Sequence, residues 1–266
     1  MKLEVSRFGQ LENQQTGKTI LLIHPFPFDG RLWGTVAQNL GAKNYVLVPN
    51  LRGCGQTDLG SDEPDLNLLA EDLIELAEIE KLEHLVLAGI SLGGYVAMAL
   101  ARIKPELISG LVLLDTKAGV DSTEAKENRH RIAAQMQSTG RAKVSLFAEQ
   151  MIENVVGRFT HENRPQVVTQ VKNWILAAKP ETIAWLQLAM AERPDSFATL
   201  ATLNIPTLLI RGAQDVISSA QDFSLMQKNL RQVTYLEIPN VGHLPPVEDP
   251  IATFTAMDQW LTTFAN

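Results

Sequence analysis

The chain has 266 residues, of which 45% are hydrophobic and 20% are charged, and it carries a formal net charge of −7 at pH 7. This composition is ordinary for a globular domain, and the negative balance argues against a general nucleic-acid-binding surface. The single cysteine, Cys54, excludes an internal disulfide framework and favours a reducing, cytoplasmic location. We expect no signal peptide and no membrane segment, because no stretch is long and apolar enough.

Strands and helices alternate along the first part of the chain. Candidate strands cover residues 3–8, 19–24, 45–48, 85–88 and 111–114, and candidate helices cover 31–40, 65–81 and the residues that follow Ser91. The strand at 85–88 is apolar on both faces, which is typical of a central parallel strand. The alternation predicts an α/β fold with a mostly parallel, doubly wound sheet.

The alternation stops between residues 117 and 191. That stretch has four helix-like segments, at 123–138, 141–156, 164–178 and 180–191. Afterwards the alternation resumes, with candidate strands at 207–210 and 234–238 and candidate helices at 218–230 and 250–264. We therefore expect one core domain, made of residues 1–116 and 192–266, with a helical lid inserted at 117–191 above the strand ends.

The sequence Gly89-Ile90-Ser91-Leu92-Gly93 matches the G-x-S-x-G nucleophile elbow. In such an elbow a tight strand-to-helix turn pushes the serine hydroxyl out of the sheet, and small flanking residues prevent collisions. The turn also places the Leu92 N–H at a helix N-terminus, where it can stabilise an oxyanion. The pattern therefore predicts that Ser91 is a nucleophile.

A serine nucleophile needs a base and a carboxylate that orients the base. His243 follows a predicted strand near the C-terminus, and Asp215 follows the preceding strand. The chain order Ser91, Asp215, His243 is the order of the α/β-hydrolase triad. Asp115, at the end of another strand, is the alternative orienting acid.

The chain resembles the α/β-hydrolase superfamily over nearly its whole length. Closest in pattern are small, cofactor-free carboxylesterases and proteins similar to 3-oxoadipate enol-lactonase. The matching stretches are His24-Pro25-Phe26-Pro27, Leu51-Arg52-Gly53-Cys54-Gly55, Gly89 to Gly94, Gly212-Ala213-Gln214-Asp215 and Gly242-His243. None of them is specific to a substrate.

Two positions depart from the family pattern. Family members usually have His-Gly where this chain has His24-Pro25, and the next residue supplies the second oxyanion N–H, which here is Phe26. Pro27 follows Phe26 and makes this loop stiff. We expect an oxyanion hole formed by the Phe26 and Leu92 amides, with His24 bracing the loop. The second departure is Asn50, where aspartate is common and where we expect a structural role.

Other features bear on substrate and cofactor. Histidines and carboxylates do not cluster with the spacing of metal ligands, so we expect no metal and no other cofactor. The predicted lid has ten Lys and Arg against seven Asp and Glu, which could favour a substrate with a carboxylate, although solvated helix faces explain the same balance. The residues expected to bind substrate are Phe28, Trp174, Trp185 and Arg129.

These observations predict a serine hydrolase that cleaves small carboxylic esters or lactones through an acyl-enzyme. Alternatives are a perhydrolase or haloperoxidase-like enzyme on the same triad, a carbon–carbon bond hydrolase, and a ligand sensor that does not turn over. We expect the partner to be a small molecule, and a monomer or small homo-oligomer fits equally well.

Overall fold

The protein is described by a computed structural model that covers residues 1–10, 17–139 and 141–263. At its centre is a seven-stranded sheet in the order β1-β3-β2-β4-β5-β6-β7. Its strands are β1 (Val5–Phe8), β2 (Thr19–Ile23), β3 (Tyr45–Pro49), β4 (Leu85–Ile90), β5 (Ile108–Leu114), β6 (Thr207–Gly212) and β7 (Val233–Ile238). β1 pairs with β3 in antiparallel orientation, and the other strand pairs are parallel. The prediction of a mostly parallel α/β sheet is confirmed.

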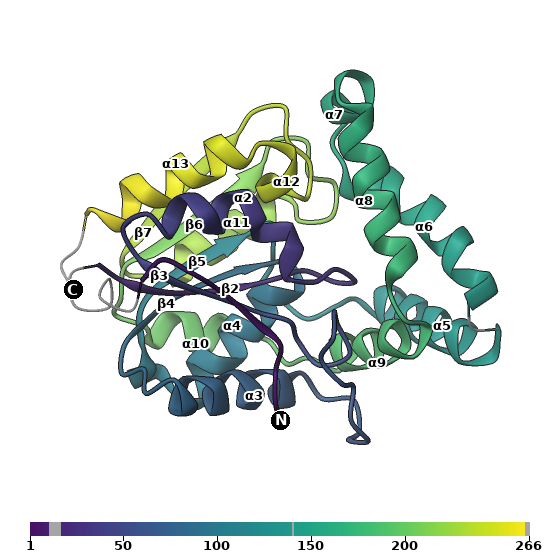
Figure 1. Cartoon of the computed structure of the whole chain (residues 1–266), viewed down its shortest axis with the longest axis horizontal. Helices are drawn as coiled ribbons and strands as arrows, with labels where there is room; N and C mark the ends of the chain where they lie inside the picture. Colours follow the sequence, from purple (N-terminus) through teal and green to yellow (C-terminus); the bar gives the residue numbers. More distant parts are fainter. Residues whose placement is uncertain (11–16, 140, 264–266) are drawn as a thin grey trace.

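Helices cover both faces of the sheet (Figure 1). They are α2 (Gly34–Leu40), α3 (Leu66–Ile79), α4 (Leu92–Ile103), α10 (Phe197–Thr202), α11 (Ala220–Asn229), α12 (Pro245–Glu248) and α13 (Pro250–Leu261), with short 3₁₀ turns η1 (Gly30–Trp33) and η2 (Pro105–Leu107). Side chains of the buried strands alternate between two cores, as the period of two requires. In β2, Ile20 and Leu22 pack in the core beneath α2 and α13, whereas Leu21 and Ile23 pack in the core beneath α3 and α4.

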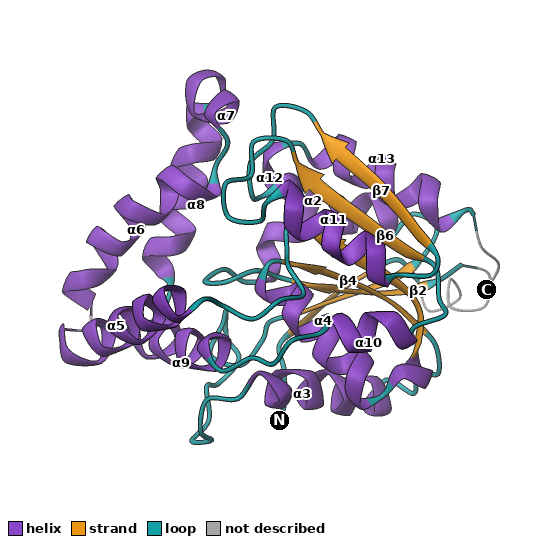
Figure 2. Ribbon diagram, turned by 180° about the vertical axis from the view of Figure 1, so that it is seen from behind, coloured by secondary structure: helices purple, strands orange, loops and turns teal. Residues whose placement is uncertain are grey.

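A group of helices inserted between β5 and β6 lies beside the carboxyl ends of the strands, where the arrowheads of β6 and β7 point (Figure 2). These helices are α5 (Thr123–Thr139), α6 (Arg141–Val155), α7 (Arg158–Asn163), α8 (Pro165–Ala177) and α9 (Pro180–Ala191). Four helices were predicted here, and five are present in the described residues. The helix missed by the prediction, α7, has 6 residues between Gly157 and Pro165, too few for a periodic pattern to stand out.

Several predicted boundaries were wrong. The first strand begins at Val5, two residues later than expected, and the predicted helix at 31–40 is divided into η1 and α2 at Gly34. The short helices α10 and α12 were not predicted.

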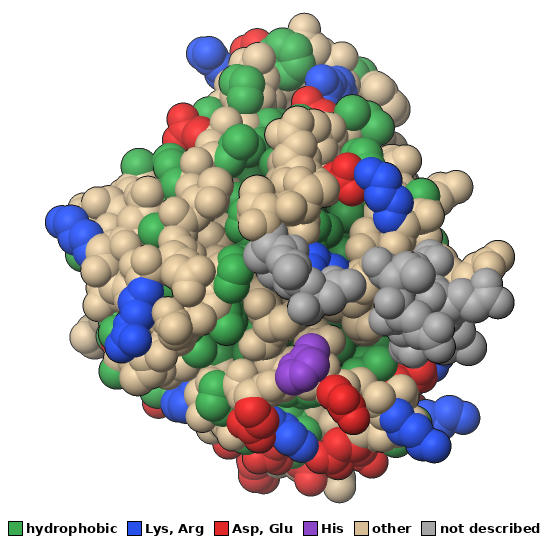
Figure 3. Space-filling model, turned by 90° about the vertical axis from the view of Figure 1, so that its left-hand side faces the viewer, with side chains coloured by type: hydrophobic (Ala, Val, Ile, Leu, Met, Phe, Trp, Pro, Cys, Tyr) green, Lys and Arg blue, Asp and Glu red, His purple; other side chains and the backbone are tan. Residues whose placement is uncertain are grey.

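None of the described helices is long and apolar enough to cross a bilayer. At the end of the molecule away from the inserted helices, basic side chains lie scattered among acidic ones (Figure 3).

Candidate active site

Ser91 lies at the junction of β4 and α4 in a strained backbone conformation. Its φ is 53° and its ψ is −115°, a combination that side-chain-bearing residues rarely adopt. The turn is fixed because the Ser91 N–H donates to the Leu114 carbonyl at 3.0 Å, and the Ser91 carbonyl accepts from Thr116 Oγ1 at 2.8 Å. Ser91 is half-buried, so its side chain remains partly accessible.

The glycines around Ser91 permit this turn. A Cβ atom on Gly89 would lie 2.2 Å from the Gly93 carbonyl oxygen, and one on Gly93 would lie 2.2 Å from the Ile23 carbonyl oxygen. A Cβ on Gly94 would meet Thr116 Oγ1 at 2.5 Å. The first two contacts are with backbone, which cannot rotate away. Side-chain-free positions are therefore required by packing, as the sequence motif indicates.

His243 and Asp215 form a buried pair on two neighbouring loops. His243 Nδ1 lies 3.0 Å from Asp215 Oδ2, and the histidine is 3% exposed. Asp215 also accepts from the backbone N–H groups of Ile217 at 2.8 Å and Ser218 at 3.1 Å. Burial works to raise the pKa of Asp215, but His243 and the Ile217 N–H, with Asp115, outweigh it, so the pKa lies below its usual value. Asp215 therefore stays ionised and holds the imidazole with Nδ1 protonated.

Asp115 lies next to this pair but does not bond to His243. Its Oδ1 accepts from the Gly212 N–H at 2.8 Å, while Oδ2 has no donor within the described part of the chain. One Asp115 oxygen lies within 4.8 Å of both an Asp215 oxygen and a His243 ring nitrogen. Burial, and then the charge of Asp215, raise the pKa of Asp115 well above its usual value. Asp115 therefore keeps its proton to a higher pH than an ordinary aspartate does, and the structure pairs Asp215, rather than Asp115, with the imidazole.

Glu248 joins the His243 loop to the inserted helices. Its Oε1 accepts from the N–H groups of Gly242 and Leu244, and its Oε2 accepts from the Gly157 N–H and from Thr160 Oγ1. Only 1% of this residue is exposed. The carboxylate therefore fixes the loop that carries His243 against the start of α7. Sequence reasoning missed Glu248, because its partners at Gly157 and Thr160 are about 90 residues away in the chain.

His24 braces the loop that we expect to supply the Phe26 amide. His24 is fully buried and bridges two loops: Nε2 accepts from the Leu51 N–H at 3.0 Å, and Nδ1 lies 3.0 Å from the Pro25 carbonyl. The Phe26 and Leu92 backbone N–H groups take part in no hydrogen bond among the described residues, so both remain available as donors. The Phe26 ring meets Phe147 of α6 edge-on, with ring centroids 6.0 Å apart.

A cavity of about 400 Å³ has Ser91 and His243 on its wall. Its lining comes from the core and from α5, α6 and α9, so the cavity lies between the carboxyl ends of the strands and the inserted helices. The apolar part consists of Phe26, Tyr95, Ile132, Phe147, Met151, Val155, Met190 and Ile217. The polar part consists of Lys117, Asn128, Arg129, Arg131, Gln150, Asn154 and Gln187. A volume of this size accommodates a small organic substrate.

The four residues expected to bind substrate lie in different places. Arg129 lines the cavity of Ser91. Phe28 and Trp174 line a second cavity of about 460 Å³ and are not among the residues that line the cavity of Ser91. Trp185 lines neither cavity: its Nε1–H donates to the Asp62 carbonyl at 2.8 Å, and its side chain packs in the core beneath α3 and α4. An aromatic residue in a helix carries no sequence signal for which side it faces.

Three further residues show why the loop around Arg52 is structural. Arg52 is buried and donates to Asp72 from Nε at 2.8 Å and from Nη2 at 2.9 Å. Asn50 accepts from the Gly30 N–H at 2.6 Å and donates to Glu4. Cys54 is buried, and burial raises the pKa of its thiol to about 12, which leaves it without thiolate character.

Comparison with known proteins agrees with this geometry. A model of an alpha/beta hydrolase family matches residues 20–256. The chain belongs to that family. The hydrolase is 27% identical, over 90% of its length and 94% of the relative's, to a pimeloyl-[acyl-carrier protein] methyl ester esterase of Nitrosomonas europaea. It is 24% identical to 3-oxoadipate enol-lactonase 2 of Acinetobacter baylyi, over 84% of this chain and 80% of that protein.

Among solved structures, the hydrolase is similar to a thermophilic esterase from Thermogutta terrifontis with malate bound. The TM-score is 0.91 at 38% sequence identity, and the match covers 98% of this chain and 93% of that one. The resemblance to esterases and enol-lactonases expected from the sequence is therefore confirmed.

Proposed function

We propose that this hydrolase cleaves small carboxylic esters or lactones through an acyl-enzyme on Ser91. The observation that carries the proposal is the His243–Asp215 pair, 3.0 Å apart, with His243 lining the same cavity as Ser91. A serine at a strained turn and a histidine oriented by a carboxylate are the parts that nucleophilic acyl transfer needs. Relatives named as esterases and enol-lactonases support the same class of reaction.

The chemistry assigns each group one task. Ser91 Oγ attacks the substrate carbonyl while His243 Nε2 takes the hydroxyl proton, and Asp215 stabilises the resulting imidazolium. The Phe26 and Leu92 amides donate to the tetrahedral oxyanion. His243 then protonates the leaving alcohol oxygen. Water, activated by the same imidazole, attacks the acyl-enzyme, releases the acid and returns the proton to Ser91.

We assign the helices within residues 117–191 the role of a lid. They supply most of the cavity wall opposite Ser91, and Glu248 ties their α6–α7 junction to the loop of His243. A cover of this kind limits the access of water to the reacting atoms. Because α5, α6 and α9 line the cavity, we expect the lid to set the size of the acyl group that is accepted.

The test is hydrolysis of p-nitrophenyl acetate, butyrate and octanoate, followed for many turnovers with the wild type and with Ser91→Ala. We expect repeated turnover by the wild type and a loss of at least about 1000-fold in kcat for the variant. Val120→Ala, at an exposed position outside the cavity lining, is the control and should match the wild type. Release that stops near one equivalent would contradict the proposal and favour a ligand sensor.

A further inference from the structure

The cavity of Ser91 has an uneven distribution of charge. Three cationic residues line it, namely Lys117, Arg129 and Arg131, and neither aspartate nor glutamate is among its lining residues in the described ranges. Water-filled clefts lined by charge of one sign attract ligands of the opposite sign, because low-dielectric walls focus the field. The cavity is therefore suited to a substrate that carries negative charge away from the reacting carbonyl.

A single buried carboxylate pairs with two of these cations and with a third, Arg193, that does not line the cavity. Asp121, whose side chain is 1% exposed, pairs with Arg129 Nε, with Arg193 Nη2 at 2.8 Å and with Lys117 Nζ at 3.7 Å. Burial would raise the pKa of Asp121, but Arg193 and Arg129 outweigh it, and the pKa lies far below its usual value. Three positive charges against one negative charge leave an excess of two, which a bound anion would offset.

The members of this cluster differ in their freedom to bind a ligand. Arg193 is 2% exposed along its side chain and stacks 4.1 Å above the Tyr95 ring, so it acts from behind the wall. Arg129 is fixed by Asp121 and by Gln187 Oε1 at 2.9 Å. Lys117 is 25% exposed along its side chain and its only ion pair among the described residues is the long one to Asp121. The ammonium group of Lys117 is thus the cation best able to turn towards a ligand.

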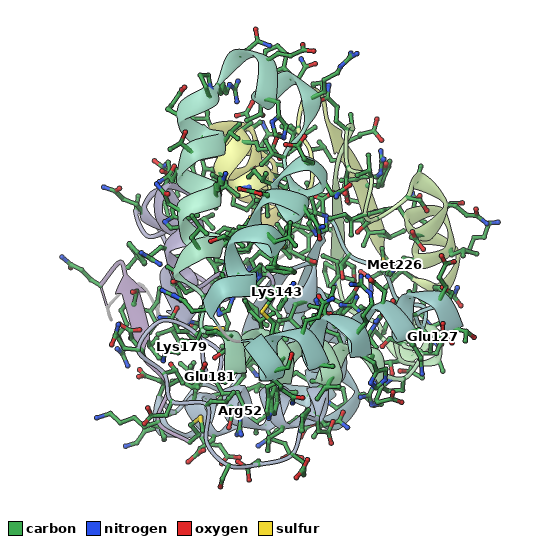
Figure 4. The ribbon with its side chains drawn as sticks, turned by 90° about the vertical axis from the view of Figure 1, so that its right-hand side faces the viewer. Arg52, Glu127, Lys143, Lys179, Glu181 and Met226 are labelled. Atoms are coloured by element: carbon green, nitrogen blue, oxygen red, sulfur yellow. The ribbon has the colours of Figure 1, made fainter. Side chains whose placement is uncertain are left out.

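Arg131 contributes less than Lys117 and Arg129 to binding an anion in this cavity. It donates to Asn128 Oδ1 and also lines a neighbouring surface hollow, in which Glu124 and Glu127 bring negative charge to the same lining. Figure 4 shows this side of the molecule, with Glu127 near one end of α5 and Lys143 near the start of α6. The balance of charge therefore favours the Lys117–Arg129 side of the cavity over the Arg131 side.

We propose that Lys117 and Arg129, positioned by Asp121, bind a carboxylate carried by the ester at the end away from its reacting carbonyl. This inference rests on the proposed function and names its substrate class: anionic esters in preference to neutral ones. Lys117 forms the direct ion pair, and Arg129, which lines the same cavity, presents a guanidinium fixed by Asp121 and Gln187. Lys117 and Arg129 are then specificity-determining residues, distinct from the groups that act on the carbonyl.

The test compares three methyl esters of equal acyl length, namely monomethyl adipate, methyl hexanoate and methyl 6-aminohexanoate. At neutral pH their far ends are anionic, neutral and cationic. We expect kcat/KM to fall in that order, with monomethyl adipate at least about 10-fold better than methyl hexanoate at low salt. The preference should shrink as salt is added, because a partly exposed ion pair is screened. An ester with its carboxylate on the alcohol side, 5-acetoxypentanoate against pentyl acetate, tells which half of the substrate carries the charge.

Lys117→Met removes the charge and keeps the length of the side chain. We expect it to lower the ratio of kcat/KM for the anionic ester to that for the neutral ester by about 10-fold, which corresponds to roughly 1.4 kcal/mol. The matched control is Lys126→Met on α5, which makes the same change in charge outside the cavity lining and should leave the ratio unchanged. Thermal melting of both variants checks that they are folded.

Two results separate this inference from the proposed function. Equal kcat/KM for anionic and neutral esters, or an unchanged ratio in Lys117→Met, would overturn the inference while leaving ester hydrolysis in place. Failure of the wild type to turn over p-nitrophenyl butyrate and all of the methyl and acetyl esters would overturn the proposed function instead.

Discussion

The carboxyl group of Asp115 is buried beside the ionised carboxylate of Asp215, and this arrangement ties its protonation to stability. The folded state keeps the proton of Asp115 over a range in which the unfolded chain, with an ordinary pKa of about 3.9, has released it. The unfolded state therefore binds fewer protons from about pH 4 up to the raised pKa. Across that window the contribution of Asp115 to the free energy of unfolding falls as pH rises, by up to about 1.4 kcal/mol per pH unit.

Asp115→Asn should remove this dependence. The amide keeps an acceptor for the Gly212 N–H and adds a donor that needs no ionisable proton. We expect the free energy of unfolding of the variant, minus that of the wild type, to grow between pH 5 and pH 7, as measured by urea unfolding. Asp58→Asn, which makes the same change at an exposed position, should follow the wild-type curve. Parallel curves for Asp115→Asn and the wild type would contradict a neutral Asp115.

Among single residues, the sequence predicted those that stand in a recognisable motif or directly after a strand. Ser91, Asp215 and His243 each follow a parallel strand, so all three lie at the carboxyl ends of the strands. The sequence did not predict a role for Glu248 or for Lys117. Glu248 looks like one more charge in a C-terminal loop, and its role depends on Gly157 and Thr160, which only tertiary structure brings near. Trp185 lies outside both cavities, which composition alone could not show, because it does not reveal which side of a helix faces a cavity.

Among the elements, the β4–α4 junction depends most on its glycines. A methyl group at Gly93 would lie 2.2 Å from the Ile23 carbonyl oxygen and 3.0 Å from that of His24, so β2 and the loop that follows it would have to shift. We expect Gly93→Ala to lower the free energy of unfolding by about 2 kcal/mol or more. It should also lower kcat, since the displaced loop carries the Phe26 amide. Chemical denaturation and ester hydrolysis measure the two effects.

Gly34 provides the matched control for that substitution. It begins α2 with helical dihedral angles, and a Cβ there would meet nothing within 4 Å. We expect Gly34→Ala to stabilise the protein by about 0.5–1 kcal/mol, because alanine loses less conformational freedom on folding. If both substitutions had the same effect, the close approach at Gly93 would not be what restricts it to glycine.

The elements that could be predicted are those with a strong periodic or apolar pattern. β4 and β5 are apolar on both faces, and α3 is amphipathic, so each was placed within a few residues. α7 and α12 are too short to show a period, and their ends are fixed by tertiary contacts around Glu248. The break in alternation after β5 predicted helices at 117–191, and α5 to α9 lie between β5 and β6, but α7 was not predicted.

For the whole molecule, function depends on how two parts meet. The core supplies Ser91, His243, Asp215 and the two amides, while α5, α6 and α9 supply most of the cavity wall, and Lys117 comes from the loop between β5 and α5. Glu248 and Gln214 join the parts, since Gln214 Oε1 accepts from the Phe159 N–H at 2.9 Å. The sequence predicted both parts, and it pointed to a basic insertion. It could not show that Asp121 gathers those cations at one wall.

The most direct test of the central claim is the covalent one. Wild type, Ser91→Ala and His243→Ala are treated with a butyl p-nitrophenyl phosphonate, which mimics the tetrahedral intermediate, and their intact masses are measured. The account predicts one adduct per wild-type chain, mapped to Ser91 by peptide analysis, with none on Ser91→Ala and far slower labelling of His243→Ala. An adduct of equal yield on Ser91→Ala, or one mapped to another residue, would contradict the claim that Ser91 is the nucleophile.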